Sequence, residues 1–184
     1  MEERALVPDE TLLVAQARAG STGAFEELLA RHDRELRALA FRLLDDRAAM
    51  DDVLQDAYVK AFVALRDFTG RSAFGTWLYR IVYNTALDEL RRRSRRRAVR
   101  WDDVPEIADR AQDPADAASI HVDLASALEA LPPDLRAIVL MVDAAGMDYG
   151  EAAEVLGVPP GTVASRLNRA RRMLRLSLSA PGAS

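Results

Sequence analysis

The stretch 148-DYGEAAEVLGVPPGTVASRLNRARRMLR-175, close to the carboxyl end, decides the fold of the second half of the chain. Asp148 followed three residues later by Glu151 has the pattern of a capping box at a helix start. Gly157 suits the end of that helix, and Val158-Pro159-Pro160 is a short turn into another helix. Two short helices joined by a tight turn that contains glycine predict a helix-turn-helix.

The second helix of this motif divides its side chains between two faces. Apolar residues at helical spacing are expected on the buried side: Val163, Leu167, Ala170 and Leu174. Polar residues point the opposite way: Ser165, Asn168, Arg169 and Arg172. Arginine donates two hydrogen bonds to guanine and asparagine pairs with adenine, so this face predicts a reader of the DNA major groove. The alternative, an arginine-rich helix on a solvent surface, is less favoured because a capped turn precedes the helix.

The amino-terminal half also reads as helices. From Asp9 to Arg97 apolar residues recur at steps of three and four, first at Phe25, Leu28, Leu29, Leu36, Leu39, Leu43 and Leu44. After Asp45 and Asp46, which we expect to be caps, the pattern repeats at Met50, Val53, Leu54, Ala57, Ala61 and Leu65. A third long helix is expected from near Ser72, with Phe74, Trp77, Leu78 and Ile81 buried. No strand-like alternation occurs, so the fold class is all-α.

Between these halves the apolar periodicity lapses. The segment from Ala98 to Ser119 contains Pro105, Pro114 and scattered aspartates, which are poor helix material. We therefore expect a flexible linker at 98–118 between two small helical domains at 9–97 and 119–178. The second domain is expected to open with Ile120, Leu124, Leu128 and Leu131 on one helix face, followed by a break at Pro132-Pro133.

Charge is segregated along the chain. Seven of the ten residues at 91–100 are arginine, 101–134 holds nine acidic residues and one arginine, and 160–176 has five arginines and no acid. A net charge of −4 therefore hides two basic zones. Since the distribution of charge matters more than its sum, both zones are candidate DNA contacts. An arginine run taken alone fits a solvated helix face equally well.

Composition excludes several classes of site and location. With no cysteine and only His32 and His121, we expect no disulfide, no zinc site and no cofactor. No apolar run approaches the roughly 20 residues of a membrane span, and the first ten residues lack the basic and apolar blocks of a secretory signal. We expect a cytoplasmic protein without direct membrane insertion.

Three motifs, in this order, resemble those of extracytoplasmic-function (ECF) sigma factors, compact members of the sigma-70 family. They are Asp52-Val53-Leu54-Gln55-Asp56, the segment 68-FTGRSAFGTWLYRI-81 with Asn84, and 161-GTVASR-166 leading to Arg169-Ala170-Arg171. The resemblance runs from about Asp9 to Leu178. It implies a region-two helical bundle and a region-four helix-turn-helix as the only domains. It also implies promoter-specific transcription initiation, of a stress or envelope regulon, without catalysis by the chain itself.

The resemblance also implies partners and roles for particular residues. Asp52, Gln55 and Asp56 would dock on the clamp helices of the largest subunit of core RNA polymerase, and the second domain would meet its flap region. These positions form one polar stripe opposite the apolar face, although an ordinary wet helix face would look the same. A further implied partner is an anti-sigma factor.

Promoter DNA is the other implied partner. Holding an extruded minus-ten base requires a pocket and stacking surfaces, which a helix bearing Trp77, Tyr79 and Tyr83 could supply. We expect Trp77 itself to belong to the core. The expected minus-ten contacts are Phe68, Arg71, Arg80, Asn84 and Arg91, with Arg91 to Arg97 gripping the DNA backbone. The expected minus-thirty-five contacts are Thr162, Ser165, Arg166, Asn168, Arg169 and Arg172, but Ala164 stands where many relatives carry a basic residue.

Two other functions compete with this interpretation. A dimeric helix-turn-helix repressor would explain the second basic zone, but it leaves the aromatic and arginine-rich segment 68–97 without a task. A metal-dependent nuclease would use Asp45, Asp46, Asp51, Asp52 and Asp56, yet two-metal chemistry needs carboxylates that converge on ions about 4 Å apart. On a helix these residues spread around the surface. His32 and His121 fall in different domains and are expected to be packing or surface residues.

Overall fold

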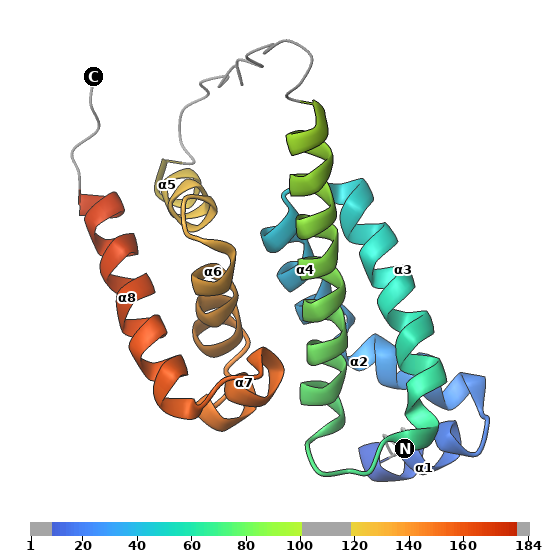
Figure 1. Cartoon of the computed structure of the whole chain (residues 1–184). Helices are drawn as coiled ribbons and strands as arrows, with labels where there is room; N and C mark the ends of the chain where they lie inside the picture. The colour runs from blue at the N-terminus through green and yellow to red at the C-terminus, as the bar shows by residue number, and fades with distance from the viewer. Residues whose placement is uncertain (1–8, 101–118, 180–184) are drawn as a thin grey trace, which may run out of the picture.

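The computed structural model of the 184-residue chain describes residues 9–100 and 119–179 (Figure 1). These residues form eight α-helices and two short helical turns, and none of them lies in a strand. The expected all-α class is confirmed. None of the helices in these two ranges is long and apolar enough to cross a membrane.

The first domain contains α1 (Glu10–Arg18), α2 (Thr22–Leu44), α3 (Arg47–Ala64), the 3-10 turn η1 (Leu65–Asp67) and α4 (Phe74–Arg100). Each of the first three helices is preceded by a residue whose side-chain oxygen accepts a hydrogen bond from the first turn. The backbone N–H groups of that turn have no partner within the helix, so the side chain satisfies one of them. The capping residues are Asp9, Ser21 and Asp46. Asp45 ends α2 in a left-handed conformation, with φ of 49°. The expectation that Asp45 and Asp46 are caps is confirmed.

The core of this domain follows the predicted apolar faces. Leu28 and Leu36 of α2, Leu54 of α3, and Leu78 and Val82 of α4 are fully buried. At one end α4 comes so close to α2 that a Cβ added to Gly75 would lie 2.8 Å from the His32 ring. Only glycine fits that position without a shift of His32.

The second domain contains α5 (Ser119–Glu129), α6 (Pro133–Val139), the π turn η2 (Leu140–Ala144), α7 (Tyr149–Leu156) and α8 (Pro160–Ser179). The predicted capping box is present: the N–H of Glu151 donates to Asp148 at 2.8 Å, and the N–H of Asp148 donates to Glu151 at 2.9 Å. Gly157 ends α7 with φ of 66°. The helix-turn-helix is therefore α7 and α8. Leu124, predicted on the buried face, is 42% exposed, whereas Ala127 and Leu128 nearer the end of α5 are buried. The side chain of Ile120, predicted on the same face, lies outside the described residues.

The predicted end of the first domain differs from the end of the helix in the structure. α4 continues to Arg100, three residues beyond the predicted end of the first domain at Arg97. The rest of the predicted linker, 101–118, lies outside the described residues.

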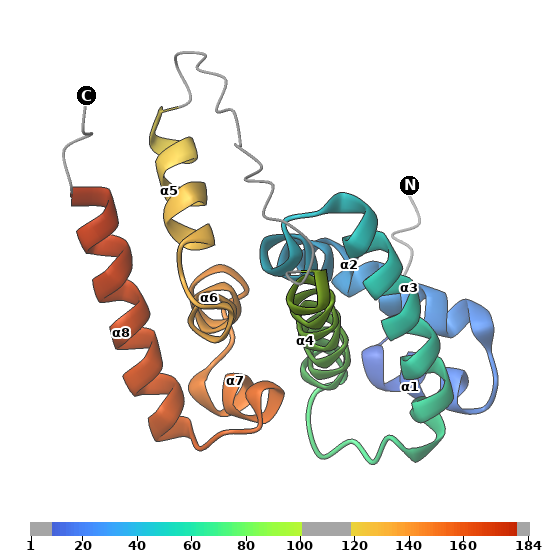
Figure 2. The ribbon, with the colours of Figure 1, turned by 45° about the horizontal axis from the view of Figure 1, so that its top comes forward.

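α4 is the helix of the first domain that packs against the second domain. α2 and α3 pack on one side of it, and α7 packs on the other (Figure 2). Hydrogen bonds that cross the boundary include one from Arg136 Nη1 to the carbonyl oxygen of Arg42 at 2.7 Å and one from Thr76 Oγ1 to Glu151 Oε1 at 3.4 Å. The arrangement is closed, with the helix-turn-helix against the bundle.

The cap at Asp46 supplies a test of the fold. Its carboxylate accepts from the N–H of Ala49 and pairs with Arg93 at 2.9 Å, and these contacts hold the pKa of Asp46 below its ordinary value. The stabilisation is therefore complete above the ordinary carboxyl pKa and is lost as the pH falls through the lowered pKa. Asp46→Ala should lower the melting temperature at neutral pH, and the difference from the parent chain should shrink in acid. An equal difference at both pH values would contradict this role.

Candidate polymerase and DNA interfaces

The predicted polymerase-binding residues share one exposed face of α3. Asp52, Gln55 and Asp56 all point away from the buried Val53, Leu54 and Ala57. The same face continues toward the end of the helix with three exposed apolar side chains: Val59 (61% exposed), Phe62 (41%) and Val63 (70%). We call these six residues the α3 stripe. It is polar in its first half and apolar in its second.

The apolar half was missed by the sequence interpretation. Val59, Phe62 and Val63 fall outside the three- and four-residue spacing that defines the buried face of α3. Apolar residues that face opposite to a helix's own buried side are the signal that would have found them. The ring of Phe62 packs against the ring of Phe25, and the two ring centroids are 5.2 Å apart.

A charged groove of about 540 Å³ borders the polar half of the α3 stripe. Its α3 wall includes Asp52, Gln55 and Asp56, and its α4 wall includes Arg92 and Arg96. A partner helix on the stripe would therefore meet carboxylates first and arginines at the far wall.

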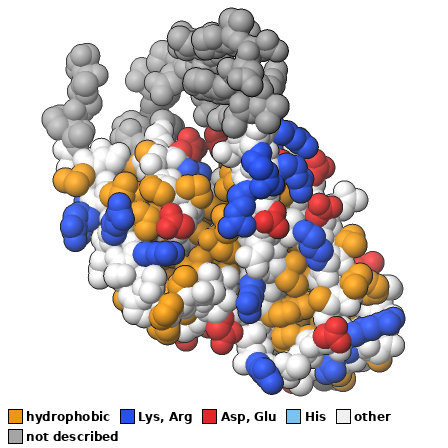
Figure 3. Space-filling model, viewed as in Figure 1, with side chains coloured by type: hydrophobic (Ala, Val, Ile, Leu, Met, Phe, Trp, Pro, Cys, Tyr) orange, Lys and Arg blue, Asp and Glu red, His pale blue; other side chains and the backbone are white. Residues whose placement is uncertain are grey.

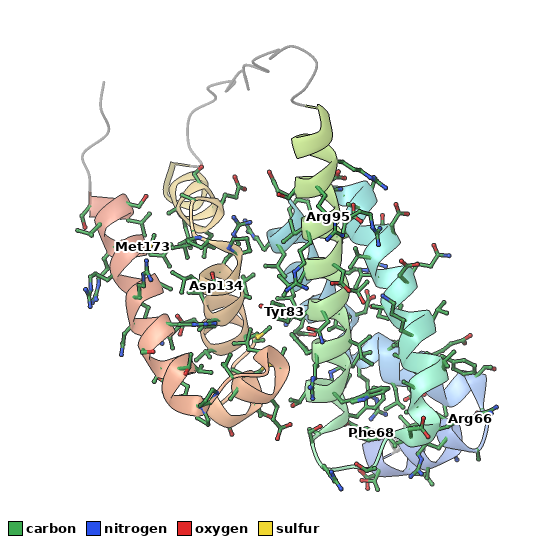
Figure 4. All side chains as sticks on the ribbon, in the orientation of Figure 1. Arg66, Phe68, Tyr83, Arg95, Asp134 and Met173 are labelled. Atoms are coloured by element: carbon green, nitrogen blue, oxygen red, sulfur yellow. The ribbon has the colours of Figure 1, made fainter. Side chains whose placement is uncertain are left out.

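The predicted minus-ten residues divide into two groups. Arg80, Asn84 and Arg91 are exposed along one side of α4, and Arg71 is exposed in the loop before it. Phe68 lies differently from the prediction, since only 8% of it is exposed. Its ring packs on Trp77 and Phe74, with centroids 5.0 and 6.0 Å away, because an apolar ring beside two others is better buried than solvated (Figure 4). Phe68 thus anchors the loop rather than presenting a surface, and Trp77 is partly buried against the core, as expected.

The two tyrosines expected to offer stacking surfaces are covered. Tyr79 and Tyr83 are each only 5% exposed, and burial raises the pKa of both hydroxyls. Tyr79 lies in a cleft whose opposite wall is Leu140, Ala144 and Ala145 of the second domain. Tyr83 is within electrostatic range of Asp134 across the boundary between α4 and α6 (Figure 4). In this closed arrangement the second domain occupies their outer side.

The predicted minus-thirty-five residues lie along α8. Ser165, Asn168, Arg169 and Arg172 are exposed, as their spacing predicted. Thr162 and Arg166 are half-buried at the start of the helix, where Thr162 accepts a hydrogen bond from Ser165 Oγ at 3.0 Å through its carbonyl oxygen. Arg166 Nη1 lies 3.8 Å from an oxygen of Asp134. Arg171 points off this face and pairs with Asp143.

Arginine side chains gather over the upper part of α4 and along α8 (Figure 3). On α4, local carboxylates already hold three of them: Arg91 with Asp88 at 3.2 Å, Arg92 with Glu89 at 2.7 Å, and Arg93 with Glu89 and Asp46. Arg95 and Arg96 are exposed and have no carboxylate within 4.0 Å among the described residues. The side chains of Arg97 and Arg100 lie outside the description.

Two of the acidic residues that a nuclease would use have structural roles. Asp46 caps α3, and Asp51 pairs with Arg37 at 2.9 Å. Within 9–100 and the described part of the second domain, no group of three or more histidine and carboxylate side chains is placed to hold a metal. His32 is half-buried, 3.7 Å from Glu10, and the side chain of His121 is outside the described residues.

Comparison with known proteins decides the family. The family model "Sigma-70 region 2" matches residues 28–96, and "Sigma-70, region 4" matches residues 121–174. The ECF RNA polymerase sigma factor SigM of Mycobacterium tuberculosis is 39% identical over 169 residues, which is 91% of this chain and 84% of SigM. The chain belongs to the ECF family of RNA polymerase sigma factors.

Other relatives agree with this assignment. The ECF sigma-E factor of Escherichia coli is 32% identical over 90% of this chain and 92% of its own length. SigE of Mycolicibacterium smegmatis is 36% identical over 83% of this chain, which spans 60% of that longer protein. As an ECF sigma factor, the chain directs promoter-specific transcription initiation. The repressor alternative is not supported, because the matches include the segment 68–97 that a repressor would leave unused.

Two solved structures resemble both domains together. CnrH, in complex with the cytosolic domain of CnrY, aligns with a TM-score of 0.71 at 32% identity over 94% of this chain and 99% of that one. The sigma factor RpoE of Bartonella quintana, in complex with the anti-sigma factor NepR, aligns with a TM-score of 0.70 at 31% identity over 86% of this chain and 98% of that one.

Proposed function

We propose that this sigma factor binds core RNA polymerase through the α3 stripe and reads promoter DNA with one face of α4 and one of α8. The observation that carries the proposal is the exposure of three separate side-chain stripes with suited chemistry. These are the mixed α3 stripe, the Arg80, Asn84 and Arg91 side of α4, and the polar face of α8. The polymerase would perform the chemistry, so the chain needs no catalytic group of its own.

The α3 stripe suits a long partner helix. Carboxylates and an amide in its first half would pair with basic side chains, and the valines and phenylalanine in its second half would bury apolar area. Exposed ion pairs contribute little on their own, whereas burial of apolar surface contributes about 25 cal/mol per Å². The apolar half should therefore carry more of the affinity, and the polar half should set the orientation.

Charge inserted into either half of the α3 stripe tests the docking site. Asp52→Lys and Val63→Lys should each weaken binding of the chain to core polymerase about tenfold or more, measured by fluorescence titration. Neither should change the melting temperature greatly, because both side chains are exposed. Ala64→Lys is the matched control, since Ala64 is exposed on the same helix but off the stripe. Equal losses for all three variants would reject the stripe as the docking site.

On α4, the amide of Asn84 and the guanidinium groups of Arg80 and Arg91 follow one another along a single side of the helix. Such groups can hydrogen-bond an extruded base and its phosphates. Asn84→Ala should reduce promoter opening, measured by permanganate reactivity of unpaired thymines, while binding to core polymerase is unchanged. Ser94→Ala, an exposed change farther along α4, should leave opening intact. Loss of core binding by Asn84→Ala would assign this residue to the polymerase instead.

On α8, neighbouring arginines provide an internal comparison. Arg169 is exposed on the polar face, whereas Arg171 is held by Asp143 off that face. Arg169→Ala should weaken closed-complex formation by the holoenzyme by about 1–3 kcal/mol if it makes a bidentate contact with a base. Arg171→Ala should have a much smaller effect. Equal effects on binding would show that α8 contributes only general positive charge.

An inhibitory protein partner is a further part of the proposal. The two sigma factors that align with this chain over both domains were each solved with a bound protein, and NepR is an anti-sigma factor by name. Their overall similarity to this chain supports an anti-sigma factor that binds the closed arrangement. Such an inhibitor should compete with core polymerase for the chain.

A further inference from the structure

The cleft beside Tyr79 is bounded by side chains from three elements. α2 contributes Ala38 and Leu39, α4 contributes Tyr79, and Leu140 and Ala144 of η2 form the opposite wall. Its volume is about 150 Å³. Protein interiors are packed almost as densely as organic crystals, so a space of this size between packed elements is unusual. Two of its lining side chains, those of the alanines, are single methyl groups, so they leave the space open.

The hydroxyl of Tyr79 is the unsatisfied polar group at this cleft. It is buried without a hydrogen-bond partner among the described residues, and only 5% of Tyr79 is exposed. Glu35, which also lines the cleft, lies within electrostatic range of this hydroxyl. Burial and the Glu35 carboxylate raise the pKa of the hydroxyl, so it stays protonated at neutral pH and offers a donor. A buried donor without a partner is unfavourable, and an acceptor in the cleft would supply the missing bond.

The charges at the rim of the cleft indicate which molecules would fit. Arg34 and Glu35 pair with each other at 3.1 Å, so the guanidinium is already neutralised. A carboxylate placed at the Tyr79 hydroxyl would be repelled by Glu35, whereas a ketone or aldehyde oxygen would not. The walls formed by leucine and alanine side chains favour an apolar body on the same molecule. An apolar space of about 150 Å³ in a protein can hold one molecule of the size of benzene.

We propose that the cleft between α2, α4 and η2 is a binding site for a small uncharged aromatic molecule with one hydrogen-bond acceptor. The hydroxyl of Tyr79 donates to the acceptor, and the aromatic ring lies against Leu39, Leu140 and the alanine methyl groups. The inference does not depend on the proposed function, because the binding involves neither polymerase nor DNA. Since the walls come from both domains, a bound molecule stabilises the contact between them by mass action.

Two probes of the same shape test the role of the hydroxyl. Acetophenone carries a ring and a ketone oxygen, and α-methylstyrene has a methylene group in place of that oxygen. In NMR titrations of the isolated chain, acetophenone should bind about threefold more tightly or better, because a single hydrogen bond contributes a factor of this order. Tyr79→Phe should remove the difference between the probes. Tyr83→Phe should preserve it, because Tyr83 is equally buried on α4 but does not line the cleft.

Filling the cleft tests its place. Ala144→Leu should weaken the binding of acetophenone about tenfold or more, because the longer side chain occupies the space that the ring needs. Ala38→Leu should do the same from the opposite wall, which guards against a local effect of one substitution on the fold. Ala64→Leu is the matched control, since Ala64 is exposed on α3 outside the cleft, and it should leave binding unchanged.

The melting temperature of Tyr79→Phe separates a ligand site from a purely structural tyrosine. If the hydroxyl has no partner in the free chain, its removal should leave the melting temperature unchanged or raise it. A fall of several degrees would show that the hydroxyl is already bonded, and it would overturn the proposal. Absence of acetophenone binding, equal binding of the two probes, or unchanged binding by both cleft-filling variants would overturn it as well. None of these results bears on the proposed function, which is measured with polymerase and promoter DNA.

Discussion

Packing on both sides of α4 is the constraint on which the rest of the structure depends. Leu78, Val82 and Ala86 bury one side against the bundle, and Tyr79 and Tyr83 bury the other against the second domain. A polar side that includes Arg80, Asn84 and Arg91 is left to solvent. The apolar area on the first side is buried within one domain, whereas the tyrosine side is covered by the second domain. The position of the second domain therefore sets how much of α4 is exposed.

Local chemistry made much of the fold predictable. Caps at Asp45, Asp46 and Asp148, the glycine end at Gly157 and the polar face of α8 all follow from residues within one or two turns of each other. What the sequence could not reveal depends on contacts between distant segments. Tyr79 and Tyr83 face residues of α6 and η2 that lie more than 50 positions along the chain, and Arg136 reaches Arg42 across 94 positions. Helical periodicity contains no information about such pairs.

Two features of the site depend on exposure, which helical spacing alone does not show. Phe68 is a predicted DNA contact because the family motif includes it, and in the structure its ring is buried against Phe74 and Trp77. Val59, Phe62 and Val63 went unnoticed because apolar residues in a helix are first read as core, and only the known buried face of α3 shows that they point outward. Both cases show that exposure must be known before an apolar residue is given a role.

Oxidative footprinting by mass spectrometry tests the central structural claim, that the second domain covers Tyr79 and Tyr83 on α4. Tyr149, which is 42% exposed, serves as an internal reference. In the isolated chain Tyr79 and Tyr83, each 5% exposed, should be labelled far more slowly than Tyr149. Labelling of both tyrosines as fast as that of Tyr149 would contradict the account.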